Sequence, residues 1–343
     1  MSGVEVVAPN LKRRLSGVTA TVVRLIPVQA RMIDIRATGP GLPLELPHIP
    51  LARAAFLPRD RWRVWHARRN TEMALGLILR HVLRRRYRLL FTSAAQRRHT
   101  GFTRWLIRQQ DALIATSPQA ASYLERDATV ILHGVDTEVF HPPADRAALR
   151  RALGLDENAL LIGCFGRIRA QKGVDLLVEA ALRLFPSRPR AQLVFTGRIT
   201  PDNRAFADDL IQRIDAAGLA DRIRFLGELP WDQVVAHYQA LDLFAAPARW
   251  EGFGLTPLEA MACGVPVVAA RVGAYETLIR EGETGSLIAP GDADGLSAAL
   301  AHWLDDDAAR ARAGEAARAH VSARHKIEDE AAAIVAIYRK LLA

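Results

Sequence analysis

The sequence contains only two cysteines, Cys164 and Cys263, and each lies inside an apolar segment. A pair of this kind is too small for the disulfide framework of a secreted domain, and neither cysteine belongs to a spacing typical of zinc ligands. We therefore expect both to be small buried residues in a reducing compartment.

Long apolar runs are also missing. About half of the 343 residues are hydrophobic, yet no stretch approaches the ~20 uninterrupted apolar residues that a membrane-spanning helix needs. The first ten residues lack the basic segment and apolar run of a signal peptide. Internal repeats and low-complexity tracts are absent as well. The sequence therefore predicts a cytoplasmic protein with enough apolar residues to fill two cores.

Acidic residues are scarce in the first part of the chain. Residues 1–150 contain 24 Lys and Arg but 11 Asp and Glu, a net charge of +13, whereas the remainder has a net charge of −4. An asymmetry of this size suggests that the first half meets an anionic partner. Nucleic acid, an anionic membrane surface and an acidic substrate all remain possible on charge alone.

Short apolar strands alternate with helices from residue 159 onward, a pattern typical of a parallel sheet covered by helices on both faces. Nucleotides bind such sheets at the carboxyl ends of the strands. The first half predicts a similar α/β domain, with a Pro-rich irregular loop at 40–58 and a linker at 141–143. The expected strands are 4–8, 32–36, 63–65, 88–92, 112–115, 129–132, 159–165, 191–196, 223–226, 241–246 and 265–269. The expected helices are 17–30, 71–85, 100–110, 118–125, 174–184, 203–217, 231–240, 256–262 and 328–341.

The segment from Glu251 to Glu259 reads Glu-Gly-Phe-Gly-Leu-Thr-Pro-Leu-Glu. Pro257 suits the first turn of a helix, and Gly252 and Gly254 let the loop before it bring backbone N–H groups close to a ligand. The start of a helix favours phosphate. Because two carboxylates would repel a diphosphate, we expect the glutamates to bind hydroxyl groups, one on a sugar and one on a ribose. The alternative is two solvated glutamates beside a glycine turn.

A second segment, Gly166 to Gly173, follows the expected strand 159–165 and contains Arg167 and Lys172. Arginine holds phosphate oxygens in a planar fork, while lysine acts as a point charge. At the carboxyl end of a strand, the two side chains are suited to stabilise a departing nucleotide diphosphate without a metal ion. Gly17, between the first strand and the first helix, fits either a backbone contact to phosphate or a plain tight turn.

These motifs together resemble the retaining glycosyltransferases of family 4, which have the GT-B fold. Further matches are 225–227, 264–267 and 133–142, so that the resemblance covers roughly residues 130–300. It implies an α/β protein in which two Rossmann-like domains with parallel sheets face a central cleft. We expect an acceptor-binding domain at 1–143, a nucleotide-sugar-binding domain at 144–325 and a last helix, 326–343, that packs back on the first domain.

The same resemblance implies a donor site that uses no metal ion and no cofactor. Arg167 and Lys172 hold the diphosphate, Glu251 contacts the donor sugar, and these three are the expected catalytic residues. Glu259 contacts the ribose hydroxyls. The full set of expected donor-binding residues is Gly17, Gly166, Arg167, Lys172, Glu251, Phe253, Gly254, Leu255 and Glu259.

Segments 8–19, 64–73 and 91–100 resemble the lipopolysaccharide-core mannosyltransferases of Gram-negative bacteria. This narrower resemblance implies GDP-mannose as the donor and an inner-core Kdo sugar on lipid A as the acceptor. It also implies peripheral association with the inner face of the cytoplasmic membrane. Because the basic segment 80–88 lies in no recognised nucleic-acid-binding motif, we expect no nucleic-acid partner. We expect the cluster Arg84, Arg85, Arg86 and Arg88 to attract anionic lipid, although an ordinary solvated basic face is the alternative.

The acceptor itself is expected to contact Arg68, Arg69, Arg97, Arg98 and His99. Many family members carry a histidine in the loop after the strand equivalent to 89–92, and here the nearest candidates are His99 and His66. For both, a structural role is as well supported as a catalytic one.

Two other functions share parts of this pattern. A sugar-nucleotide 2-epimerase would have the same paired domains, and a non-enzymatic basic protein would retain a degenerate nucleotide fold. The Glu251…Glu259 motif argues against the epimerase, and the intact set of Arg167, Lys172, Glu251 and Glu259 argues against a degenerate protein. The acidic run 305–307 lies among Ala-rich helical residues with no strand before it, so we expect a solvated helix face and no metal site.

Overall fold

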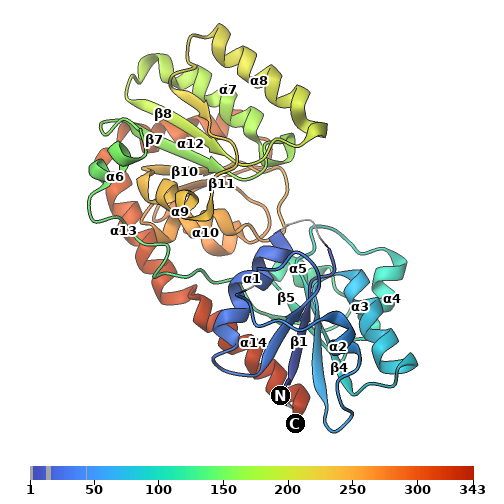
Figure 1. The fold of residues 1–343 in the computed structure, drawn as a ribbon. Coiled ribbons are helices and arrows are strands. Elements are labelled where there is room, and N and C mark those ends of the chain that lie inside the picture. Colours follow the sequence, from blue (N-terminus) through green and yellow to red (C-terminus); the bar gives the residue numbers. More distant parts are fainter. Residues whose placement is uncertain (1–2, 13–16, 44) are drawn as a thin grey trace. The chain divides into compact units, whose positions relative to one another are not determined.

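A computed structural model describes residues 3–12, 17–43 and 45–343 (Figure 1). The chain divides into two compact units, the N-terminal unit formed by Met1–Gly134 with Ile327–Ala343 and the C-terminal unit formed by Val135–Lys326. The first boundary therefore lies before the predicted position at 143. The reason is local, because Val135 pairs with Lys326 and its N–H donates to the His325 carbonyl at 2.7 Å.

The N-terminal unit is built on a six-stranded parallel sheet with the order β2-β1-β3-β4-β5-β6. Successive side chains along its strands point to opposite faces. Val64 and Leu90 belong to one apolar core together with α1 and α14, whereas Trp65 and Leu89 belong to a second core under α2, α3 and α4. The strands are β1 Val6–Pro9, β2 Ile35–Thr38, β3 Arg63–Ala67, β4 Tyr87–Ser93, β5 Ala112–Ala115 and β6 Thr129–Val130.

The helices of this unit differ from the expected ones in two places. A short helix, α2, lies inside the segment predicted to be an irregular loop, and it begins directly after Pro50. The single helix predicted at 71–85 is divided into α3 and a π-helical turn, η1. The helices are α1 Gly17–Gln29, α2 Leu51–Ala55, α3 Asn70–Leu77, η1 Ile78–Val82, α4 Gly101–Arg108, α5 Pro118–Ser122 and α14 Ile327–Leu342.

The last helix, α14, packs beside the first helix, α1, and Figure 1 shows the red α14 next to the blue α1. Its apolar residues Ile334, Val335 and Tyr338 are buried in the same core as Val22 and Leu25 of α1. Roughly 1.5–3 kcal/mol is gained for each large apolar side chain buried in this way. The end of the chain thus completes the N-terminal unit.

The C-terminal unit contains a second six-stranded parallel sheet, with the order β12-β11-β10-β7-β8-β9. The sequence did not predict the edge strand β12, which has only four residues with two half-buried positions in the middle. The strands are β7 Leu160–Phe165, β8 Ala191–Thr196, β9 Ile223–Phe225, β10 Leu243–Ala246, β11 Val267–Ala270 and β12 Gly285–Ile288.

The helices of the C-terminal unit form two groups. Helix α7 contacts α8 and α12, whereas α10 contacts α9 and α13. The α-helices are α6 Arg146–Ala152, α7 Val174–Leu184, α8 Arg204–Ala216, α9 Trp231–Ala240, α10 Leu255–Ala262, α11 Tyr275–Leu278, α12 Ala293–Asp305 and α13 Asp307–Arg324, with short 3-10 turns at η2 Ala170–Lys172, η3 Phe185–Ser187 and η4 Pro201–Asn203. Among the described residues, no helix is both long and apolar enough to cross a membrane.

The acidic run 305–307 joins α12 to α13. Asp305 pairs with Arg188 at 2.6 Å, the Asp306 carboxylate accepts the Ala309 N–H and caps α13, and Asp307 pairs with Arg310 at 2.6 Å. Each carboxylate therefore has a local structural role in a helix junction.

Candidate donor and acceptor sites

The loop after β7 carries the first donor motif. Gly166 has φ +131°, and the Cβ of any other residue at Gly197 would lie 2.0 Å from the Gly166 carbonyl oxygen. Glycine at both positions lets the loops after β7 and β8 touch. Gly173 also needs to be glycine, because a Cβ there would lie 2.0 Å from the Pro247 carbonyl oxygen after β10. Arg167 and Lys172 are therefore held at the carboxyl edge of the sheet.

The loop after β10 carries the second donor motif and leads into α10. Its last residue, Gly254, has φ +85°, and a Cβ there would lie 2.3 Å from Cε1 of Tyr275. Burial, and next the charge of Glu251, raise the pKa of Tyr275 well above its usual range, so the ring stays neutral. Among the residues that the structure describes, no side chain caps α10, and no acidic residue lies in its first turn. Its first N–H groups are therefore arranged to attract an anion.

The two donor motifs meet through an ion pair between Lys172 and Glu251. The other oxygen of the Glu251 carboxylate accepts the Gly252 N–H at 3.0 Å. Both side chains are largely buried, with exposed fractions of 20% and 14%. A lysine ammonium has three hydrogens, so the pair leaves part of the ammonium available to a diphosphate while its position stays fixed.

A second ion pair fixes the same two loops, and the sequence did not predict it. Arg249 forms two parallel hydrogen bonds to Asp175 of α7, at 2.8 and 2.7 Å. The Arg249 N–H donates to the Gln171 carbonyl at 2.8 Å, and the Gln171 side chain donates to the Trp250 carbonyl at 3.0 Å. A bidentate guanidinium–carboxylate pair restricts orientation as well as distance. Arg249 therefore restricts the movement of the two loops that carry Lys172 and Glu251.

Glu259 lies on α10, one turn inside the helix, and is half-buried. It accepts a hydrogen bond from the Tyr238 hydroxyl at 2.7 Å. Burial and the Glu259 charge raise the pKa of Tyr238 well above its usual range, so this hydroxyl remains a donor. The other predicted donor residues of the loop, Phe253 and Leu255, flank Gly254, and the Phe253 side chain is buried.

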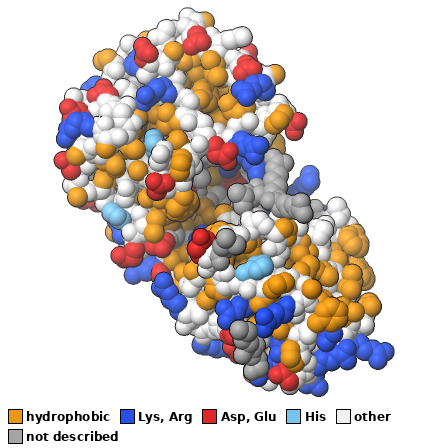
Figure 2. Space-filling view, viewed as in Figure 1, with side chains coloured by type: hydrophobic (Ala, Val, Ile, Leu, Met, Phe, Trp, Pro, Cys, Tyr) orange, Lys and Arg blue, Asp and Glu red, His pale blue; other side chains and the backbone are white. Residues whose placement is uncertain are grey.

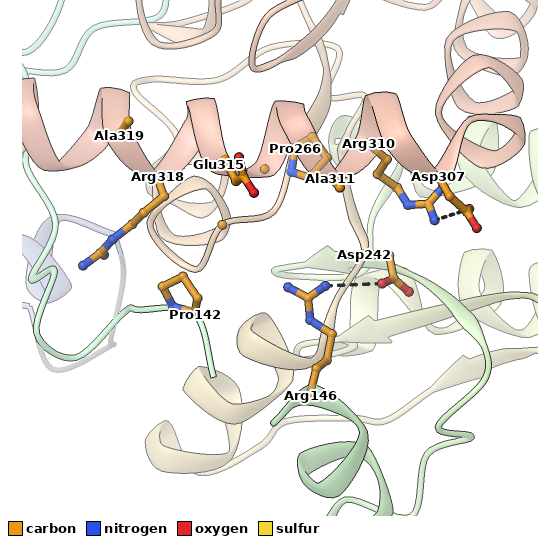
Figure 3. A pocket seen from close by; sticks show the side chains of 12 residues that line it. Pro142, Arg146, Asp242, Pro266, Asp307, Arg310, Ala311, Glu315, Arg318 and Ala319 are labelled. Atoms are coloured by element: carbon orange, nitrogen blue, oxygen red, sulfur yellow. Dashed lines mark hydrogen bonds and ion pairs between the residues drawn. The ribbon is translucent and has the colours of Figure 1, made fainter. Parts of the chain in front are cut away.

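A cavity of about 490 Å³ lies at the opposite edge of the same sheet (Figure 3). Asp242 and Pro266, which line it, directly precede β10 and β11, so they lie at the amino ends of these strands. Figure 3 shows Arg146 directed toward Asp242, and Arg310 paired with Asp307. None of the predicted donor residues lines this cavity.

In the N-terminal unit, the predicted acceptor residues Arg68 and Arg69 lie directly after β3 but differ in their contacts. The Arg69 guanidinium donates to Asn10, Glu72 and Thr19 at 2.8, 2.7 and 3.1 Å, and its side chain is 9% exposed. Arg69 therefore connects the ends of β1 and β3 to α1. The Arg68 side chain instead lines a small cavity among the strand ends.

The two candidate histidines have different surroundings. His66 is fully buried between Tyr338 and Thr92, each 2.6 Å from a ring nitrogen. Burial, and next the charge of Arg68, lower the pKa of His66 well below its usual value, so the ring is neutral. His66 thereby joins β3 and β4 to α14. His99 is half-buried with its Nε2 3.4 Å from the Ser93 hydroxyl, and burial lowers its pKa.

The remaining predicted residues of this unit lie at its surface. Arg97 and Arg98 are exposed in the loop after β4, and Gly17 is exposed at the start of α1. No described atom lies within 4 Å of the position that a Cβ would take at Gly17. The segment 13–16 before it lies outside the described residues.

A buried carboxylate on α14 forms another centre that sequence reasoning missed. Glu330 pairs with Arg24 at 2.9 Å and with His133 at 2.5 Å, and accepts the Gly134 N–H at 2.9 Å. Although burial opposes ionisation, the Arg24 charge leads the interactions that lower the pKa of Glu330 to about 2. The helical pattern of α14 predicted its apolar face but gave no signal that this acidic residue faces inward.

Comparisons with known proteins show the family to which the chain belongs. The model of the family described as glycosyl transferases group 1 matches residues 145–320, which contain every predicted donor residue except Gly17. The chain belongs to the glycosyl transferases group 1 family. Because the match covers the C-terminal unit, the loops after β7 and β10 belong to the part of the chain that defines this family.

Two curated relatives match this glycosyltransferase along its whole length. The lipopolysaccharide core biosynthesis mannosyltransferase LpcC of Rhizobium leguminosarum bv. viciae is 52% identical over 99% of this chain and 97% of its own. The lipopolysaccharide core biosynthesis mannosyltransferase LpsB of Rhizobium meliloti is 50% identical over 99% of this chain and 98% of its own.

Solved structures confirm the GT-B fold of this glycosyltransferase. The Anabaena protein HepE, solved with UDP, has a TM-score of 0.86 at 22% identity, covering 98% of this chain and all of that one. The C-terminal domain of the group 1 protein LpcC from Francisella tularensis is 32% identical over 57% of this chain and all of its own, with a TM-score of 0.54.

The described part of this glycosyltransferase contains no group of three or more His, Cys, Asp or Glu side chains arranged to hold a metal ion. Positive charge at the donor loops comes from Arg167 and Lys172, and partial positive charge from the start of α10. The arrangement can bind a diphosphate through nitrogen donors and sugar hydroxyls through two carboxylates.

Proposed function

We propose that this glycosyltransferase transfers mannose from GDP-mannose to an inner-core Kdo sugar of lipopolysaccharide, with retention of anomeric configuration and without a metal ion. Identity of 50–52% to two full-length relatives named lipopolysaccharide core biosynthesis mannosyltransferases supports the donor and acceptor. The observation that carries the chemistry is the Lys172–Glu251 pair at the carboxyl ends of β7 and β10.

In this proposal the leaving GDP is stabilised by nitrogen donors. As the bond between mannose and phosphate breaks, negative charge develops on the diphosphate. Lys172, Arg167 and the first N–H groups of α10 meet this charge from fixed positions, which lowers the barrier without reorganisation. Gly254 is essential to the arrangement because only glycine lets the loop pass Tyr275 before α10 begins.

The two carboxylates bind hydroxyl groups of the donor. Glu251 accepts hydrogen bonds from the mannose ring and also orients Lys172, so donor recognition and leaving-group stabilisation are joined in one pair. Glu259 binds the ribose hydroxyls of GDP, with its carboxylate oriented by the Tyr238 hydroxyl. The ion pair of Arg249 with Asp175 keeps both donor loops in place.

The acceptor binds the N-terminal unit, which carries the excess of positive charge. Arg68, Arg97, Arg98 and His99 lie at or beyond the carboxyl ends of β3 and β4, where they are suited to contact an anionic sugar. Arg69 supports them by ordering the strand ends. His66 links α14 to β3 and β4 through the Tyr338 and Thr92 hydroxyls, and its buried ring is neutral.

The same unit also binds the inner face of the cytoplasmic membrane. Figure 2 shows hydrophobic side chains gathered over α3 and α4, with basic side chains at their border. We name two sets: the apolar patch consists of Ile78, Val82, Phe102 and Trp105, and the basic cluster consists of Arg84, Arg85, Arg86 and Arg88. The four patch residues are 48–70% exposed, and the cluster begins two residues after Val82.

Exposed aromatic rings and arginines together suit the headgroup region of an anionic bilayer. Within the basic cluster, Arg85 lies over the Phe56 ring at 5.2 Å and Arg88 over the Trp62 ring at 4.3 Å, and both rings are exposed. Peripheral binding at this surface would bring a cytoplasmic enzyme to a lipid-linked acceptor.

A donor screen tests the proposed function. Purified protein is incubated with GDP-mannose, UDP-glucose, UDP-galactose or ADP-heptose, with and without a Kdo-containing lipid A acceptor, and release of nucleoside diphosphate is measured. We expect acceptor-dependent GDP release from GDP-mannose. Acceptor-dependent release from one of the other donors, with none from GDP-mannose, would contradict the proposed donor.

A further inference from the structure

A small cavity of about 40 Å³ lies inside the N-terminal unit, at the carboxyl ends of four strands. Arg68 follows β3, Thr92 lies near the end of β4, Thr116 follows β5 and His133 lies beyond β6. The other wall is formed by α1 and by Glu330 of α14. The cavity is thus placed where parallel sheets bind their ligands.

Two buried polar atoms in this cavity lack hydrogen-bond partners among the described residues. They are Nη2 of Arg68 and the hydroxyl oxygen of Thr116. Arg68 is 9% exposed and Thr116 is 1% exposed. Leaving a buried donor unpaired is destabilising, and more so when the group is charged. Two such groups beside one cavity therefore indicate a ligand that pairs with both.

The charge of Arg68 is also unbalanced, because the carboxylates nearby already have partners. Glu330 uses one oxygen for His133 and the other for Arg24 and the Gly134 N–H. Glu72 uses one oxygen for Arg69 and the other for the Arg68 backbone N–H. No carboxylate of the described residues forms an ion pair with Arg68, whose Nη1 donates to the His66 carbonyl at 3.5 Å and whose side chain also interacts with the Tyr338 hydroxyl.

We propose that Arg68 and Thr116 form a subsite for the carboxylate of the acceptor sugar, with the guanidinium binding one oxygen and the hydroxyl donating to the other. This assignment rests on the proposed function, which makes that sugar an acidic one. A cavity of about 40 Å³ accommodates about three water-sized centres, which matches the three non-hydrogen atoms of a carboxylate. A tetrahedral phosphate is larger and needs more donors than this cavity provides.

The subsite makes the carboxylate a requirement for acceptor recognition. A site built to pair with a polar group rejects an analogue that lacks it, because the groups of the site stay buried and unpaired. Arg68 and Thr116 are therefore specificity residues for an acidic acceptor. The exposed Arg97 and Arg98 contact parts of the acceptor that stay in solvent, where a missing partner is replaced by water.

Acetate titration tests the subsite without any turnover. Acetate is added to isotope-labelled protein at constant ionic strength, and the NMR signals of the Arg68 side chain and the Thr116 amide are followed. We expect a saturable shift in the wild type and in the control Thr71→Val, which removes an exposed hydroxyl on α3. In Arg68→Gln, acetate should no longer shift the signal of the Thr116 amide. In Thr116→Val, acetate should no longer shift the signal of the Arg68 side chain.

An unsaturable response in the wild type, or equal shifts in all variants, would overturn the subsite. Inorganic phosphate forms a second arm of the titration. Phosphate that displaces acetate and binds more tightly would overturn the assignment to a carboxylate.

A pair of acceptors then links the subsite to transfer. The wild type should use a Kdo-containing acceptor with a KM about 10- to 100-fold lower than that for its carboxamide, because one charged hydrogen bond is lost. Thr116→Val keeps the side-chain shape and should bring the two KM values within about threefold, while the KM for donor stays unchanged. Equal KM values in the wild type would contradict the proposal. Absence of mannosyl transfer altogether would refute the proposed function, and the acetate titration would still decide the subsite.

Discussion

In the proposed function, the donor chemistry depends on two basic residues in the loop after β7, Arg167 and Lys172. Arg167→Ala and Lys172→Ala should each lower kcat, because each removes positive charge from the leaving diphosphate. A lost charged contact costs about 1.5–3 kcal/mol, or roughly 10- to 200-fold in rate. The matched control is Arg190→Ala, whose side chain is 61% exposed. Steady-state transfer assays check the prediction, which fails if both variants retain more than half of wild-type activity.

The role of Gly254 can be tested against a matched control. Gly291 has a nearly identical φ, but open space surrounds it. Gly254 has φ +85° and Gly291 has φ +83°, but only at Gly254 would a Cβ collide with Tyr275. Alanine at either position incurs the left-handed penalty of roughly 1–2 kcal/mol. Gly254→Ala should lose a further 1–3 kcal/mol or so of unfolding free energy from overpacking, together with activity.

Urea unfolding and transfer assays on both variants measure this difference. Equal stability of Gly254→Ala and Gly291→Ala, with full activity in each, would show that the close approach to Tyr275 does not position α10.

At the level of single residues, the sequence singled out the residues that we propose for the donor site, but not the contacts that hold their loops in place. Arg167, Lys172 and Glu251 stood out because charged residues and glycines follow apolar strands. The bidentate pair of Arg249 with Asp175 joins residues 74 positions apart, and no local pattern indicates such a partner. The same limit applies to Arg69, whose internal partners come from three separate segments.

Among the elements, α14 illustrates a second limit of sequence patterns. Its apolar period predicted a buried face, and the structure places that face on α1. The inward-facing Glu330 is not part of this apolar period, so the pattern gave no sign that it is buried. Two short elements were missed for other reasons. The five-residue helix α2 lies within a Pro-rich segment, and the four-residue strand β12 has two half-buried positions in its middle. Longer strands such as β4 and β8 were predicted almost to the residue.

Glu330 makes the stability contributed by α14 depend on pH. Its pKa is about 2 in the folded protein against an ordinary value of 4.5. Because the folded pKa is the lower one, the contribution of about 3 kcal/mol is present above pH 4.5 and is lost as the pH falls toward 2. Glu330→Gln should therefore be less stable than the wild type at pH 7, and the difference should shrink at lower pH.

Chemical unfolding between pH 3 and pH 7 measures this difference, with the exposed Glu328→Gln on the same helix as the control. A stability difference between Glu330→Gln and wild type that does not change with pH would contradict the ionised state of Glu330.

For the whole molecule, the division of charge predicts where the protein meets a membrane. Replacing the four arginines of the basic cluster by glutamine should weaken binding to anionic liposomes by about 1 kcal/mol per residue at low salt. Transfer to a soluble, delipidated acceptor should be preserved. The control replaces four exposed arginines of the C-terminal unit, Arg183, Arg190, Arg271 and Arg280.

Co-sedimentation at two salt concentrations checks this prediction, since added salt should weaken binding of the wild type. The double variant of the apolar patch, Phe102→Ser with Trp105→Ser, should weaken the binding that remains at high salt. Liposome binding that is equal in the basic-cluster variant and the control would show that this surface does not face the membrane.

The central claim is a metal-independent transfer of mannose with retained configuration. The most direct measurement is NMR of the product formed from GDP-α-mannose and a Kdo-containing acceptor in the presence of excess chelator. An α-linked mannosyl product, formed at nearly the same rate with and without chelator, is the predicted result, because Arg167, Lys172 and the start of α10 replace a cation. A β-linked product, or transfer that stops in chelator and returns with magnesium or manganese, would contradict it.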